Sequence, residues 1–239
     1  MSKIYFISDL HFHHTNILRY EPRRIKLTCE YVVNNNLIMF DCSPKEMINN
    51  LIKKYTQALI DNNKELIEEC LTYHDEMILD SINKKVKEED TLYFLGDFGY
   101  CQYGCGTKFH KVKEEIKNKI IELGNKIKCK NKIMICGNHD WRYTSSDGTH
   151  FLNDEVKDFW HKVGFKDVYA NPILLKEWFL LSHEPVTYMN PNAIFFNICG
   201  HVHSNPMYIT ESEHHLIVCG DRFDFKPQQI DKFNINPYS

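Results

Sequence analysis

The chain lacks long hydrophobic runs and excess positive charge, and it has few residues that break regular structure. It has 10 glycines and 8 prolines among 239 residues, while Ile, Lys and Asn are frequent, which suggests an AT-rich genome such as that of a bacterium or its phage. No apolar run approaches the ~18 residues of a membrane span, so we expect no membrane partner. The formal net charge of −3 predicts no strongly basic surface, so long duplex nucleic acid is not an expected partner.

Cysteine occurs nine times, which is an odd number. Several cysteines, such as Cys136, Cys199 and Cys219, lie in strand-like runs, where small buried thiols are common. The first residues lead directly into a strand with a polar end, so we predict no signal peptide. We therefore expect reduced cysteines and a cytoplasmic location.

The length and the apolar content of 43% suit one large domain over residues 1–239. The character of the chain changes at about 22–72, where turn-forming residues surround a long helical pattern and candidate catalytic groups are few. We interpret 22–72 as a mainly helical insertion within that domain. It is a cap over the site, a dimerisation element that would give a homodimer, or a partner-binding element.

Five strand-like runs each end in Asp, Asn or His. The runs cover residues 3–7, 91–95, 132–135, 178–181 and 194–198, and a further strand is expected at 216–219. In an open α/β sheet, ligands bind at the carboxyl ends of the strands. Helices are expected at 44–70, with Ser43 as the N-cap, and at 74–87, 109–123 and 154–163. Alternating elements early and strands late predict an α/β sandwich of mixed sheets.

The polar strand ends carry side chains that bind Zn, Mn, Fe or Ni. The candidate ligands are Asp9, His11, Asp97, Asn138, His183, His201 and His203. Seven ligands are too many for one tetrahedral site, but they fit two metal ions that share a carboxylate. In Asp-x-His and His-x-His, two side chains lie on the same side of an extended segment, because side chains alternate along a strand.

These motifs resemble those of the calcineurin-like metallophosphoesterase superfamily, and they stand in the order typical of that family. They are Asp9-x-His11, Gly96-Asp97, Gly137-Asn138-His139-Asp140, His183 and Gly200-His201-x-His203. Residues 8–17 (SDLHFHHTNI) resemble the start of the small bacterial and phage phosphoesterases of this superfamily, SDxHFxHxNI. The resemblance extends over most of the chain apart from about 22–72.

The resemblance implies a four-layer α/β/β/α sandwich with two divalent metal ions, and it assigns the ligands to them. One ion would be held by Asp9, His11, Asp97 and His203. The other would be held by Asp97, Asn138, His183 and His201, so that Asp97 bridges. His139 would not bind metal but would face the phosphate or the leaving oxygen, and Asp140 would hydrogen-bond His139 and set its tautomer.

The expected activity is hydrolysis of a phosphate ester by in-line attack of a metal-bound hydroxide, with a phosphodiester favoured over a monoester. A nucleotide, a cyclic nucleotide or a nucleic-acid end would be a suitable substrate. Two alternatives remain open. One is a binding or scaffold protein on the same fold, which the filled ligand positions disfavour, and the other is a protein with a single or structural metal.

A second group of residues could contact the substrate. His14 and Asn16 belong to the motif that carries the resemblance, and Arg19 and Arg23 have guanidinium groups whose geometry matches phosphate. Plain loop structure and a solvated cluster of charges are the competing interpretations for these four residues.

Overall fold

A computed structural model describes residues 2–100, 113–186 and 195–230, and these form two compact units. One unit combines residues 1–12 with 81–239, and we call it the sheet unit. The other covers residues 13–80, and we call it the helical unit. The expected insertion at 22–72 lies inside the helical unit, and its status as an insertion relative to the family stays a prediction. In the described residues, no helix has both the length and the apolar character needed to cross a membrane.

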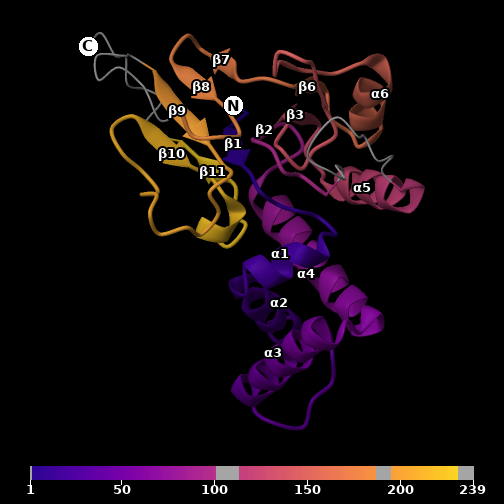
Figure 1. The fold of residues 1–239 in the computed structure, drawn as a ribbon. Coiled ribbons are helices and arrows are strands. Elements are labelled where there is room, and N and C mark those ends of the chain that lie inside the picture. The colour runs from indigo at the N-terminus through magenta and orange to yellow at the C-terminus, as the bar shows by residue number, and fades with distance from the viewer. Residues whose placement is uncertain (1, 101–112, 187–194, 231–239) are drawn as a thin grey trace. The chain divides into compact units, whose positions relative to one another are not determined.

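The sheet unit contains two larger sheets and a small hairpin (Figure 1). The first sheet has the order β11 (Gln228–Gln229), β1 (Ile4–Ile7), β2 (Thr91–Phe94), β3 (Asn131–Ile135) and β6 (Asp167–Tyr169). The second has the order β10 (His215–Ile217), β9 (Phe196–Cys199), β8 (Phe179–Leu181) and β7 (Ile173–Leu175). The hairpin joins β4 (Tyr143–Thr144) to β5 (His150–Phe151).

Both larger sheets are mixed, as expected. Strands β1, β2, β3 and β6 run parallel and β11 runs antiparallel to β1. In the second sheet, β8, β9 and β10 are parallel while β7 is antiparallel to β8. The predicted α/β sandwich of mixed sheets is therefore confirmed.

The core of the sandwich lies between the two sheets. Alternate residues of the first sheet, such as Phe6, Tyr93 and Ile135, pack with Leu181 and Ile198 of the second. This follows from the alternation of side chains along a strand, which gives each sheet one face for the shared core.

Helices α5 (Glu114–Lys126) and α6 (Asp154–Lys162) are joined to the first sheet by side chains that point away from the core between the sheets. Phe94 of β2 contacts the rings of Phe98 and Phe165, and Trp160 of α6 packs against the same two rings. Buried Lys132 of β3 donates from Nζ to the carbonyl of Gly124 in α5, at 2.6 Å. The part of the expected 109–123 helix before residue 113 lies outside the described residues.

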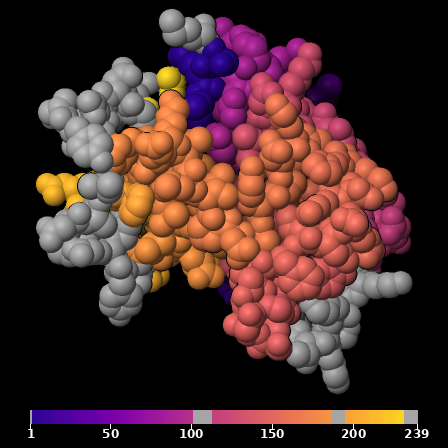
Figure 2. Space-filling view, turned by 90° about the horizontal axis from the view of Figure 1, so that it is seen from above, coloured from indigo at the N-terminus to yellow at the C-terminus, as the bar shows by residue number. Residues whose placement is uncertain are grey.

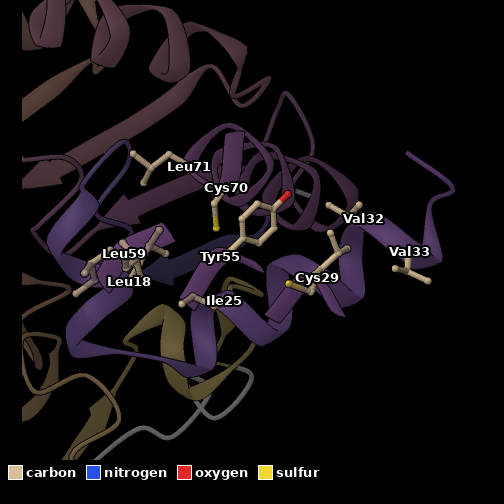
Figure 3. Packing of buried hydrophobic residues seen from close by; sticks show 11 residues of the cluster. Leu18, Ile25, Cys29, Val32, Val33, Tyr55, Leu59, Cys70 and Leu71 are labelled. Carbon is tan, nitrogen blue, oxygen red and sulfur yellow. The ribbon is translucent and has the colours of Figure 1, made fainter. Parts of the chain in front are cut away.

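The helical unit has an apolar core of its own (Figure 3). It is formed by α1 (Thr15–Tyr20), α2 (Arg23–Asn34), α3 (Pro44–Asp61) and the first part of α4 (Lys64–Lys85). Tyr55 of α3 lies among Cys29 and Cys70, and its hydroxyl donates to Glu69 at 2.6 Å. Its separate core explains why this segment forms a compact unit.

Two helix boundaries differ from the sequence-based expectation. The helix expected at 44–70 ends at Asp61, because Asn62 adopts a left-handed conformation (φ 52°), and α4 then continues through 74–85 without a break. Arg23–Asn34 form α2 with Pro22 as its N-cap, in a stretch where the sequence indicated turn-forming residues and no helix was expected. The Ser43 cap is confirmed, since its hydroxyl accepts a hydrogen bond from the backbone N–H of Glu46 at 3.3 Å.

Candidate metal centre

The expected ligands of the sheet unit converge at the carboxyl ends of its strands. Asp9 and His11 follow β1, Asp97 follows β2 and Asn138 follows β3. His183 follows β8, and His201 and His203 follow β9. The end of β1 is joined to the second sheet, because Ser8 donates to the carbonyl of Val218 and accepts from the N–H of Gly220. This junction brings ligands from both sheets to one edge of the sandwich.

Four of these residues form a group that could hold a metal ion. One ligand atom from each of Asp9, His11, Asp97 and His203 lies within 4.8 Å of the other three. His11 Nε2 is 3.4 Å from Asp97 Oδ2, and His203 Nε2 is 3.5 Å from Asp9 Oδ1. Asp9, His11 and Asp97 are almost fully buried.

Asp97 also belongs to a second group with Asn138, His183 and His201. His183 Nε2 lies 3.4 Å from Asp97 Oδ2 and 2.9 Å from Asn138 Oδ1. His201 Nδ1 lies 3.0 Å from Asn138 Oδ1 and 3.2 Å from His183 Nε2. Thus Oδ2 of Asp97 faces a histidine from each group, as a bridging carboxylate would.

The spacing and the donor types of both groups fit divalent metals. Nitrogen and oxygen ligands lie ~2.0–2.2 Å from zinc, so tetrahedral neighbours are separated by about 3.3–3.6 Å. The contacts between neighbouring ligand atoms in the two groups, from 2.9 to 3.5 Å, are near this range. Imidazole, carboxylate and amide oxygen are the donor set of Zn, Mn, Fe and Ni.

The charges of the site also favour a cation. Burial raises the pKa of Asp97, but His183 and then His11 and His139 outweigh it and hold this pKa well below its usual range. Burial lowers the pKa of His183, yet Asp97 more than offsets this and raises it to about 10. The buried carboxylates therefore favour a positive charge at the position that a divalent ion would take.

The backbone of the candidate ligands is unusual. Five of them have positive φ angles, which are uncommon for residues other than glycine. They are Asp9 (58°), His11 (50°), Asp97 (53°), His201 (72°) and His203 (46°). Such conformations cost about 1–3 kcal/mol each and tend to cluster at functional sites.

Comparison with known proteins agrees with this geometry. A family model described as calcineurin-like phosphoesterase matches residues 2–207. The chain belongs to this family. Membership in the calcineurin-like phosphoesterases supports metal-dependent hydrolysis of phosphate esters.

Two solved structures resemble this calcineurin-like phosphoesterase. A protein of unknown function, AQ665 from Aquifex aeolicus, is 22% identical, with 98% of each chain covered and a TM-score of 0.50, and it shares the fold. The nuclease MPE from Pseudomonas putida is 23% identical over 54% of this chain and 52% of its own, with a TM-score of 0.34. No curated protein sequence matches the chain.

Asp221 is a further site residue that the sequence analysis missed. It is buried in the 3-10 helix η1 (Gly220–Arg222), and its Oδ2 lies 2.8 Å from Nδ1 of His203. A carboxylate behind a histidine ligand fixes the ring and its tautomer. The sequence did contain a signal, because Gly220-Asp221 follows a strand-like run just as Gly96-Asp97 does.

Asp140 is fully buried and holds the loop that carries Asp97. Its carboxylate accepts hydrogen bonds from the backbone N–H groups of Asp97 at 2.6 Å, Gly137 at 2.7 Å and Phe98 at 3.0 Å. Burial, followed by the charge of Asp97, raises the pKa of Asp140 to about 7. The expected hydrogen bond from Asp140 to the His139 ring stays a prediction. The structure adds a second role for Asp140, which is to hold the backbone of the Asp97 loop in place.

Close backbone approach explains the glycine of the Asn-His-Asp loop. A Cβ atom on Gly137 would collide with the Asp97 carboxylate, so a larger residue there would displace the shared ligand. His139 also donates its backbone N–H to Asp97 Oδ1, at 2.9 Å. The loops after β2 and β3 therefore hold each other in place.

The four candidate substrate contacts belong to the helical unit. His14 is buried, whereas Asn16 and Arg23 are exposed. Arg19 donates from Nη2 to the carbonyl of Leu59 at 2.9 Å and to Oδ1 of Asn62 at 2.7 Å, so its guanidinium supports the end of α3. A role of these residues in substrate binding stays a prediction.

Proposed function

We propose that the chain is a dinuclear metal-dependent phosphodiesterase. The observation that carries this proposal is that two groups of ligand atoms share Asp97. One ion would be held by Asp9, His11, Asp97 and His203, and the other by Asp97, Asn138, His183 and His201. Two bound divalent ions would neutralise charge that builds on the phosphate and activate water as the nucleophile.

His139 is the residue proposed to act on the substrate rather than on a metal. It is half-buried, and its ring centre lies 5.2 Å from that of His11. From this position, the imidazole would stabilise the phosphate or the oxygen of the leaving group. Electrostatic stabilisation by a fixed donor is a large contribution to many catalysed reactions.

The proposed substrate is a phosphodiester with a nucleotide character, such as a nucleotide ester, a cyclic nucleotide or a nucleic-acid end. No nucleophilic side chain is needed, so we expect no covalent intermediate. The net charge of −3 argues against tight binding along a long duplex. Manganese is the first metal to test, because the donor set suits it as well as zinc or iron.

The test compares bis-p-nitrophenyl phosphate with p-nitrophenyl phosphate, after chelation and readdition of Mn²⁺. Cleavage of the diester that depends on metal would support the proposal. Faster cleavage of the monoester would instead indicate a phosphatase. Two bound metals per chain without hydrolysis of either compound would favour a binding or scaffold protein on the same fold, and one metal per chain would contradict the dinuclear site.

A further inference from the structure

A cavity of about 250 Å³ lies beside the candidate metal centre, in the sheet unit. Its lining includes Cys136 after β3, Arg142 and His150 from the hairpin region, and His183 and Glu184 after β8. Figure 2 shows the chain around residue 150 (salmon) adjoining the chain around residue 180 (orange) on one face. Since His183 belongs to both the second ligand group and this cavity, a group bound here would lie next to the scissile phosphate.

Arg142 is held in a fixed position in the wall of this cavity. Its Nη1 donates to the carbonyl of Cys136 at 3.1 Å and to that of Ala170 at 3.4 Å. The preceding residue, Trp141, is also held in place, because its carbonyl accepts a hydrogen bond from Trp160 Nε1 at 3.1 Å. Across the described ranges, Nε and Nη2 of Arg142 have no protein acceptor, so these donors remain for a ligand.

His150 is fixed in a similar way on the β4–β5 hairpin. Its Nδ1 lies 3.0 Å from the hydroxyl of Thr144, and its carbonyl accepts from Nδ2 of Asn171 at 2.8 Å. Burial, and then the charge of Arg142, lower the pKa of His150, which favours a neutral imidazole. A neutral ring can present Nε2 to a polar but uncharged ligand.

The composition of the cavity argues against a second phosphate as its occupant. The positive charge of Arg142 is opposed by the exposed carboxylate of Glu184. Pro172, Pro185 and Ile135 add apolar walls. The volume is below the ~300–1,000 Å³ of pockets for drug-sized ligands, so the space suits one ring system.

We propose that this cavity binds the nucleobase of a nucleotide ester, with Arg142 and His150 hydrogen-bonded to its polar edge. A nucleobase has a flat apolar face together with donors and acceptors, which matches the walls and the charged groups. This inference rests on the proposed phosphodiesterase function, and it makes the cavity the determinant of substrate specificity.

The experiment uses the Mn²⁺-loaded full chain and two diesters that release the same p-nitrophenolate. One is the p-nitrophenyl ester of thymidine 5′-monophosphate, and the other is bis-p-nitrophenyl phosphate. The ratio of their kcat/KM values should fall about tenfold or more in Arg142→Gln, which loses hydrogen bonds from a charged group, and by about two- to tenfold in His150→Ala, which loses a hydrogen bond from a neutral ring. Lys130→Gln removes an exposed positive charge and serves as the matched control.

Binding of the four common nucleoside 5′-monophosphates, measured by calorimetry, gives a second readout that does not depend on turnover. At least one should bind more tightly than inorganic phosphate, and Arg142→Gln should remove that difference. If wild type cleaves bis-p-nitrophenyl phosphate but neither variant changes the ratio or the binding, the nucleobase inference is wrong while the proposed function stands. A third outcome would be that metal is bound, that neither diester is cleaved and that no nucleotide binds more tightly than inorganic phosphate. In that case both the proposed phosphodiesterase function and the nucleobase inference are wrong.

Discussion

The metal-site loops of the sheet unit and the helices of the helical unit differ in how they place their side chains. The loops bury carboxylates and imidazoles, and five of the candidate ligands have left-handed backbone conformations. The helical unit buries mainly apolar side chains on regular helices, and its left-handed residues, His13, Asn36 and Asn62, lie outside the helices. Two of these three are asparagines, a residue type that tolerates this conformation at a helix end. Local preferences therefore explain the helical unit, whereas the site depends on contacts between distant segments.

Replacing Asp97, the ligand that both groups share, should have the largest effect on the difference between the metal-site loops and the helical unit. Asp97→Asn removes a carboxylate that faces His11 and His183, so metal content should fall and diester hydrolysis should drop by more than the ~10–100-fold typical of residues behind the ligands. Metal analysis and kinetics on the same preparation measure both. Two full metal equivalents in this variant would contradict a bridging role, and exposed Asp167→Asn is the control.

His139→Ala should separate catalysis from metal binding within the same loop. We expect unchanged metal content and a rate lower by about 10²–10³-fold, as for loss of one donor that stabilises charge. Steady-state kinetics at saturating Mn²⁺ provide the test, with exposed His214→Ala as the control. A variant that kept the full rate would show that the assigned role is wrong.

Removal of metal should affect the sheet unit more than the helical unit. A ligand at 100 times its dissociation constant stabilises the native state by about 2.7 kcal/mol. Hydrogen exchange with and without EDTA should show loss of protection around residues 7–12 and 95–98. Protection of helices α2 and α3, which have a separate apolar core, should change little. Equal loss of protection in both units would contradict the difference between them.

Asp221→Asn tests the residue that the motifs did not reveal. Because Asp221 orients His203, this change should reduce metal affinity or activity by about 10–100-fold. Titration with Mn²⁺ would measure the affinity, and Asp158→Asn on the exposed side of α6 is the matched control. Identical affinities would assign Asp221 a purely structural role.

Ser43→Ala should have the smallest effect. It removes the hydroxyl that caps α3, which should lower the free energy of unfolding by about 1 kcal/mol while metal content stays the same. Urea denaturation followed by circular dichroism would detect this, with exposed Ser146→Ala as the control. A loss of metal in this variant would contradict the separation of the two regions.

Much of the sheet unit could be predicted from the sequence. The apolar runs at 3–7, 91–95 and 132–135 became β1, β2 and β3, and their polar ends indicated the candidate site. These predictions succeeded because a buried strand followed by Asp, Asn or His is a local pattern. The sharing of Asp97 was inferred by resemblance, and its geometry is visible only after both sheets meet.

Other features of the structure could not be predicted, because no pattern within one segment of the sequence indicates them. The break between α3 and α4 lies at Asn62-Asn63, but the apolar spacing continues past it and suggested one helix to residue 70. The cavity wall depends on Arg142 donating to the carbonyls of Cys136, six residues before it, and of Ala170, 28 residues after it. Such tertiary hydrogen bonds cannot be inferred from spacing in one segment.

The left-handed conformations of the ligands have a consequence for protein engineering. A designer who copied only Asp9, His11, Asp97, His201 and His203 onto another sandwich would transfer their side chains but not their φ angles. On an ordinary extended or helical backbone, the same five residues would point elsewhere. The transplantable unit is therefore the set of whole loops, together with Gly137 and the buried carboxylate of Asp140 that ties two of them together.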